Sequence, residues 1–176
     1  MDNDELELCL PDLKFRDAFL AFLEDYRLSG EQRYQELRPL AETDFAGLVR
    51  TRREMEEGKN LEPNRVPATE YWLVRGGRDL LGVLRLRHYL NASLAHEGGH
   101  IGYDLRPGDR GKGYGTRMLA LALEKARAKG FKRVMVTCDK DNVPSARVIQ
   151  KNGGRLTGEV VSHHSGKTVQ HYWIQL

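Results

Sequence analysis

The sequence is poor in the features that mark secreted, membrane-embedded or metal-binding proteins. Its only cysteines, Cys9 and Cys138, lie far apart, which gives no basis for a disulfide framework and fits a reducing compartment. No apolar run approaches the roughly 18 residues needed to cross a bilayer. The acidic start, residues 1–5, lacks the apolar core of a secretory signal. No two histidines have ligand spacing on one helix face, so we expect a cytoplasmic protein with no metal site and no membrane association.

Length and charge suit one domain that binds a polyanion. With 176 residues and 40% hydrophobic residues, the chain can bury one sizeable core, and we expect a single domain over residues 1–176. Residues 1–60 hold 15 acidic against 9 basic residues, whereas the remainder holds 10 against 19. A basic C-terminal part suits a phosphate-bearing ligand. Because aromatic and basic residues are not interleaved, we expect no nucleic-acid partner.

The most informative segment is the glycine-rich run Arg110-Gly111-Lys112-Gly113-Tyr114-Gly115. An apolar, extended segment precedes it and an amphipathic helix over residues 116–129 follows. The first N–H groups of a helix have no intrahelical partner, and glycines let the backbone approach an anion closely. The run is neither a Walker A loop, which needs Gly-Lys-Ser or Gly-Lys-Thr, nor a dinucleotide fingerprint with its different glycine spacing. It predicts a pyrophosphate site of another kind.

Two patterns together resemble the GNAT superfamily of N-acetyltransferases. One is Arg-x-x-Gly-x-Gly at Arg110, Gly113 and Gly115, which resembles the coenzyme A loop of that family. The other is a buried strand over residues 131–138 followed by a short helix that Asn142 caps and Gly153 ends. The resemblance covers about residues 70–176. It implies an α/β fold with a splayed mixed sheet flanked by helices, in the element order βααβββαβαββ.

The rest of the pattern is consistent with that order. Alternation, helical spacing and turn residues predict strands at 6–10, 70–75, 80–89, 99–105, 155–162 and 168–176, and helices at 12–28 and 44–57. Gly76-Gly77-Arg78-Asp79 predicts a hairpin turn. The resemblance further implies that residues 70–176 bind the cofactor, that residues 1–69 shape the acceptor pocket, and that a homodimer can form.

The resemblance implies an enzyme that moves an acetyl group from acetyl-CoA to a primary amine of a small molecule or a peptide, by direct transfer. Asn142 is either a helix cap alone or also a cofactor contact, and Ser145 lies near the cofactor and can supply a proton. The expected cofactor-binding positions are Tyr103, Asp104, Leu105, Arg110, Gly111, Lys112, Gly113, Tyr114, Gly115, Thr116, Asn142 and Ser145.

Catalytic groups are harder to assign. Many family members carry a tyrosine as general acid in the short helix, but Ile149 stands there in this chain. An imidazole suits proton removal at neutral pH, so His100 is the first candidate base, with Glu97 as the second. Arg85, Arg87 and His88 either bind an acidic acceptor or form an exposed basic face. The missing tyrosine leaves an alternative function open, a non-catalytic acyl-CoA-binding sensor or interaction module.

Overall fold

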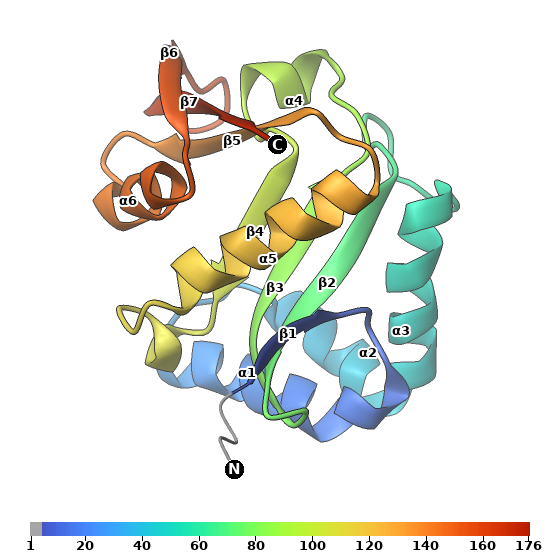
Figure 1. Cartoon of the computed structure of the whole chain (residues 1–176). Helices are drawn as coiled ribbons and strands as arrows, with labels where there is room; N and C mark the ends of the chain where they lie inside the picture. Colours follow the sequence, from blue (N-terminus) through green and yellow to red (C-terminus); the bar gives the residue numbers. More distant parts are fainter. Residues whose placement is uncertain (1–4) are drawn as a thin grey trace.

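A computed structural model of the chain describes residues 5–176 and shows one mixed sheet with helices on both faces (Figure 1). The seven strands lie in the order β1-β2-β3-β4-β5-β7-β6. All neighbours are antiparallel except β4 and β5, which run parallel and are joined through helix α5. This architecture confirms the predicted α/β class and its splayed mixed sheet.

The predicted order holds, with two short helices, α2 and α4, added to it. Asn91 starts α4, because its side chain accepts a hydrogen bond from the Leu94 N–H. The elements are β1 (Leu6–Cys9), α1 (Arg16–Leu28), α2 (Arg38–Thr43), α3 (Phe45–Glu54), β2 (Ala68–Arg75), β3 (Asp79–Arg87), α4 (Ala92–His96), β4 (Ile101–Leu105), α5 (Tyr114–Ala128), β5 (Arg133–Asp139), α6 (Val143–Lys151), β6 (Arg155–Val161) and β7 (Thr168–Gln175).

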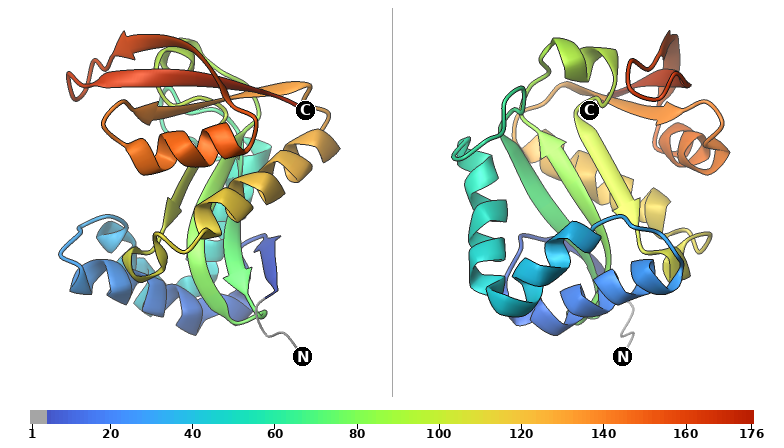
Figure 2. Two further views of the ribbon diagram at one scale, coloured as in Figure 1. Left: turned by 60° about the vertical axis from the view of Figure 1, so that its left-hand side comes forward. Right: turned by 180° about the vertical axis from the view of Figure 1, so that it is seen from behind.

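Helices cover both faces of the sheet (Figure 2). Alternating side chains in the central strands supply two hydrophobic cores, one on each face. On β2, Tyr71 and Leu73 join the core that contains α5, whereas Trp72 and Val74 join the core beneath α1, α2 and α3. The Trp72 ring is fully buried and stacks on Phe19 with 5.0 Å between ring centroids. Each buried side chain of this size stabilises the fold by about 1.5–3 kcal/mol. The two cores hold the centre of the sheet rigid.

The parallel strands β4 and β5 meet at one end and then part. Their only strand pairing is between Ile101 and Val136. Just before it, the His100 N–H donates to the Met135 carbonyl at 2.7 Å, and the Met135 N–H donates to His100 Nδ1 at 2.9 Å. Gly99 packs against the same carbonyl. We call this junction, Gly99–Ile101 with Met135–Val136, the fork, because beyond it the strands diverge and leave space between them.

The close approach of the strands at the fork predicts that a side chain at Gly99 strongly lowers the free energy of unfolding. Its φ of +64° disfavours other residues, and an added Cβ would lie 2.5 Å from the Met135 carbonyl oxygen. Gly77, at φ +66° with open space around it, is a matched control. Both alanine variants should lose about 1 kcal/mol from the left-handed backbone. Gly99→Ala should lose about 1–3 kcal/mol more from the clash.

Urea unfolding followed by circular dichroism measures both losses. Equal unfolding free energies for Gly99→Ala and Gly77→Ala would contradict the close approach of the two strands at the fork.

Candidate functional site

The loop between β4 and α5 presents a run of unused backbone donors. Gly111 and Gly113 adopt left-handed φ values of +75° and +86°, and α5 begins directly after them. Within the described residues, no backbone or side-chain acceptor binds the N–H groups from Gly111 to Thr116. Backbone donors without a protein acceptor bind water or a ligand, and at a helix N-terminus an anion is the favoured ligand. The loop therefore has the geometry of a phosphate cradle.

This loop forms one wall of a cavity of about 790 Å³, which we call the loop cavity. An added Cβ at Gly111 or Gly113 would find no atom within 4 Å, so the cavity is open above both residues. The opposite wall is the outer face of α6. The lining residues are Tyr103, Asp104, Leu105, Arg110, Gly111, Gly113, Gly115, Thr116, Asn142, Pro144, Ser145, Arg147, Val148 and Lys151.

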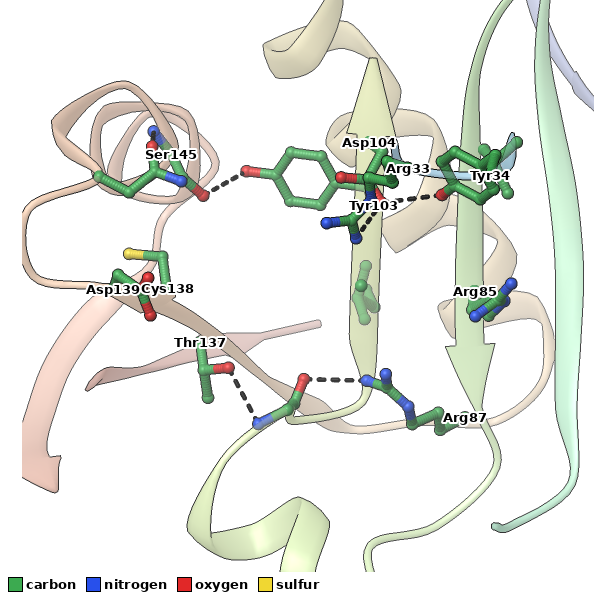
Figure 3. Close-up of a pocket in the computed structure, with 15 residues that line it drawn as sticks. Arg33, Tyr34, Arg85, Arg87, Tyr103, Asp104, Thr137, Cys138, Asp139 and Ser145 are labelled. Atoms are coloured by element: carbon green, nitrogen blue, oxygen red, sulfur yellow. Dashed lines mark hydrogen bonds and ion pairs between the residues drawn. The ribbon is translucent and has the colours of Figure 1, made fainter. Parts of the chain in front are cut away.

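A second cavity of about 330 Å³, the strand cavity, lies between β3, β4 and β5 (Figure 3). Arg33 and Tyr34 reach it from the segment after α1, Arg85 and Arg87 from β3, and Cys138 from β5. Four residues line both cavities: Tyr103, Asp104, Asn142 and Ser145. The two cavities therefore meet where β4 and β5 have parted beyond the fork.

Two hydroxyls face each other at this meeting point. Tyr103 projects from β4 towards α6, and its hydroxyl lies 3.0 Å from Ser145 Oγ (Figure 3). Burial raises the pKa of the Tyr103 hydroxyl to about 12, so it keeps its proton at neutral pH. Burial also raises the pKa of the nearby Cys138 thiol. The Tyr103 hydroxyl and the Cys138 thiol beside Ser145 are thus both protonated and uncharged at neutral pH.

One carboxylate oxygen at the meeting point has no partner. Asp104 Oδ2 accepts hydrogen bonds from the Tyr34 hydroxyl at 2.8 Å and from Arg33 Nη2 at 2.6 Å. Neither of these bonds uses Oδ1, and no other described residue donates to it. Asp104 is therefore held in place through one oxygen while the other is available to a ligand. Sequence reasoning placed Asp104 at the site but missed Arg33 and Tyr34, which lie about 70 residues earlier.

The structure distributes the predicted loop residues unequally. Arg110 lines the loop cavity, but its guanidinium makes two bonds to the Glu31 carboxylate at 2.6 and 3.0 Å. That pairing raises the pKa of the Arg110 guanidinium and anchors the loop to the segment after α1. The Lys112 side chain turns away from the cavity and donates to the Gly108 carbonyl and to Asp109. The Tyr114 hydroxyl accepts a hydrogen bond from Arg75. The last two side chains lie outside the loop cavity.

Asn142 performs the predicted cap and also lines both cavities. Its side chain accepts a hydrogen bond from the Ser145 N–H at 3.2 Å at the start of α6. Ile149, on the same helix, is fully buried in the core. Arg147 and Lys151, which sequence reasoning missed, line the loop cavity. Their spacing of four residues on a helix was the signal that could have shown them to share a face.

Neither predicted base lines a cavity. The His100 ring is buried at the fork, accepts the Met135 N–H, and packs edge-on against Phe131 and Trp173. Burial lowers the pKa of His100, with Arg87 as a secondary cause. Glu97 lies beside the β6–β7 turn, where hydrogen bonding by Ser162 lowers the pKa of its carboxyl. Neither side chain therefore lines the two cavities at whose junction the hydroxyl pair lies.

The predicted basic strand splits across the sheet. Arg85 and Arg87 line the strand cavity, whereas His88 points to the other face, where its Nε2 lies 3.0 Å from Thr69 Oγ1. Arg85 pairs with the buried carboxylate of Glu70 at 3.0 Å, and Glu70 also accepts from the Trp72 indole. Alternation along a strand explains the split, because His88 is one position beyond Arg87.

Residues 5–176 contain neither a metal-ligand cluster nor a membrane-spanning helix. No group of three or more histidine, cysteine, aspartate or glutamate side chains in this range could hold a metal ion. Every helix in it is too short or too polar to span a membrane.

Residues 34–155 match the family model of the acetyltransferase (GNAT) domain. No curated protein matches the chain. Among solved structures, the microcin C7 self-immunity acetyltransferase MccE, in complex with acetyl-CoA and AMP, superimposes with a TM-score of 0.67 at 17% identity, over 99% of this chain and 94% of that chain.

Two other solved structures are similar to the same extent. Mycobacterium smegmatis RimJ, in complex with CoA-disulfide, has a TM-score of 0.71 at 17% identity, over 97% of this chain and 81% of that one. A Salmonella typhimurium acetyltransferase that modifies the N-terminal serine of ribosomal protein L7/L12 has a TM-score of 0.66 at 17% identity, over 97% and 95%. At these identities the likeness establishes the fold.

The cradle predicts that a side chain at Gly113 blocks coenzyme A. Gly113 (φ +86°) and Gly130 (φ +88°) share one backbone conformation and an open surrounding, but Gly130 lies at the far end of α5. Alanine at either position should reduce stability by about 1 kcal/mol. Only Gly113→Ala should weaken coenzyme A binding, by at least tenfold, in a calorimetric titration. Equal affinities for the two variants would contradict the cradle.

Because His100 is buried at the fork, we expect the unfolding free energy of the protein to fall in acid. Because the folded state lowers the pKa of His100, the unfolded state binds the proton more readily, and the unfolding free energy falls as pH drops below about 6.5. His100→Asn supplies an oxygen to accept the Met135 N–H but cannot titrate. Urea unfolding should show a smaller loss between pH 7.5 and 5.5 for this variant than for the wild type. An equal loss would mean that His100 does not titrate as a buried group.

Proposed function

The chain belongs to the GNAT family of acetyltransferases, and we propose that it transfers the acetyl group of acetyl-CoA to a primary amine within one ternary complex. The observation that carries this proposal is the junction of the two cavities at Tyr103, Asp104, Asn142 and Ser145. One cavity suits a phosphate-bearing cofactor and the other suits an acceptor. Direct transfer needs both ligands to reach one place at once.

The residues of the loop cavity fit coenzyme A. Six consecutive N–H groups, Gly111 to Thr116, are free to bind its pyrophosphate, and the helix dipole of α5 adds positive charge there. Arg147 and Lys151 add two positive side chains on the facing helix. Bound acetyl-CoA supplies an activated acetyl thioester. Arg110 supports this site through Glu31, as an anchor for the loop.

The hydroxyl pair takes the place of the missing tyrosine of α6. Tyr103 holds a proton at its hydroxyl oxygen and lies within hydrogen-bond distance of Ser145 Oγ. The pair can therefore pass a proton to an anion that develops between the strands, and the hydroxyls also favour that anion electrostatically. Ile149 packs in the core and takes no part.

We assign the amine side to Asp104. Its free Oδ1 can bind the acceptor ammonium and accept a proton from it, while Tyr34 and Arg33 hold Oδ2. Because Arg33 and Tyr34 precede the sheet's central strands, this arrangement also supports a role for residues 1–69 in shaping the acceptor site. Small amines and peptide N-termini are both acceptors of this kind. The Salmonella neighbour, which modifies an N-terminal serine, motivates the inclusion of peptides.

The direct test is acetyl-CoA-dependent thiol release with a panel of amines and short peptides, with the acetylated product identified by mass spectrometry. Tyr103→Phe and Ser145→Ala should each reduce kcat about 10- to 100-fold, and the double variant should lose little more, because the two hydroxyls act as one unit. Tyr114→Phe is the matched control, since its hydroxyl bonds Arg75 outside both cavities.

Coenzyme A affinity should stay within about threefold of the wild type in all these variants. Full activity of Tyr103→Phe would remove the hydroxyl pair from the mechanism. Coenzyme A binding without thiol release for any acceptor would favour the alternative function, a non-catalytic sensor.

A further inference from the structure

Arg87 is the one arginine of the strand-cavity lining that has no carboxylate partner among the described residues. Arg33 pairs with Asp104 at 2.6 Å, and Arg85 pairs with Glu70 at 3.0 Å. Asp139 also lines the cavity, but Lys167, which lies 3.7 Å from it, binds Asp141 more closely at 2.9 Å. Within the described part of the chain, no carboxylate lies within ion-pair distance of the Arg87 guanidinium. Arg87 is therefore the positive side chain of this lining that is free to pair with a ligand.

Backbone carbonyls hold the Arg87 guanidinium in one orientation. Its Nη1 donates to the carbonyl oxygens of Gly98 and Gly99, both at 2.9 Å. The side chain lies over Gly102 of β4, where an added Cβ would be 3.4 Å from Nη2. No other described residue accepts from the remaining N–H groups. Arg87 is thus oriented in advance, with donors left over for a ligand.

The surroundings of Arg87 disfavour its charge in the absence of an anion. Burial, together with repulsion from Arg85 and Arg65, lowers the pKa of its guanidinium to about 10. A positive charge in such a place gains more from an incoming anion than one in water, because the effective dielectric constant is lower.

A second opening leads outward from the same arginines. Arg85 and Arg87 also line a cavity of about 430 Å³, the outer cavity, whose walls include Arg52, Arg65, Glu36 and Glu62. Arg65 forms no ion pair with any described residue, and Arg52 lies 3.9 Å from Glu70, which Arg85 already binds more closely. An acceptor longer than the strand cavity therefore has a path past Arg87.

The register of the sheet sets an upper limit on the distance between the Arg87 guanidinium and the reacting end. The Arg87 N–H donates to the His100 carbonyl, and Tyr103 is three residues further along β4. At about 3.3 Å per residue, this backbone separation is roughly 10 Å. Because the guanidinium reaches over Gly102, one residue before Tyr103, it lies no further than this from Asp104 and the hydroxyl pair.

We propose that the acceptor is a primary amine that carries an anionic group within about 10 Å of its nitrogen, and that Arg87 binds this group. The inference rests on the proposed function, since it assigns the amine end to Asp104. A carboxylate is the simplest group of this kind, and Arg87 can meet it with the free N–H donors of Nε and Nη2. The carboxylate can belong to a small amino acid or to an acidic side chain near a peptide N-terminus.

Matched acceptors test the proposal. One arm compares 8-aminooctanoate with its amide, and the other compares the peptide amides of Gly-Gly-Glu and Gly-Gly-Gln. The wild type should prefer the acid of at least one pair by about 10- to 100-fold in kcat/KM, mainly through KM. The pair with the larger preference identifies the source of the carboxylate. No preference in either pair would overturn the proposal.

Variants show whether Arg87 causes the preference. Arg87→Gln should abolish it, Arg87→Lys should retain part of it, and Arg127→Gln, an exposed residue of α5, should leave it intact. If Arg87 serves only to hold Gly98 and Gly99, Arg87→Gln should slow the acid and the amide equally, which would overturn the proposal. Coenzyme A affinity reports on correct folding of each variant.

A binding experiment separates this proposal from the proposed function. The protein is saturated with coenzyme A and titrated calorimetrically with octanoate and then with neutral octanamide. Binding of octanoate alone, lost in Arg87→Gln, would support the anion site even if no amine is acetylated. Equal binding of octanoate to wild type and Arg87→Gln would overturn it.

Discussion

The site depends on the point where two parallel strands stop pairing. At the fork, Gly99 and His100 tie β4 to the Met135 backbone, and the last strand pair is Ile101 with Val136. Backbone groups of β4 and β5 beyond that pair have no partner strand between them, so they need another partner. In the proposed function the cofactor is that partner, and the side chains that face the gap between the strands face the reaction.

The chemistry of the gap follows from the burial and pairing of its polar groups. On one side, Tyr103 keeps its proton because burial penalises the phenolate, and it shares a hydrogen bond with Ser145. On the other side, Asp104 is fixed through one oxygen and open at the second. In the proposed direct transfer, Tyr103 and Asp104, at neighbouring positions of β4, serve as proton donor and proton acceptor.

The sequence predicted the backbone elements well because they depend on local patterns. Glycine spacing and the start of α5 located the phosphate cradle, and Asn142 located the start of α6. Side-chain roles were harder, because they depend on distant partners and on which face a residue occupies. Glu31, which binds Arg110, is 79 residues away, and only the three-dimensional structure shows that His100 lies at the fork. Ile149 suggested a missing acid, whereas Tyr103 supplies a hydroxyl from a different element.

Amide hydrogen exchange with and without coenzyme A tests the central claim most directly, because it reports on the free N–H groups themselves. Without the ligand, the amides of residues 111–116 should exchange rapidly, as no protein acceptor protects them. With coenzyme A bound, these amides and those of residues 103–105 should slow by at least tenfold, while the amides of the β6–β7 turn stay unchanged. Protection elsewhere with none at residues 111–116 would contradict the account.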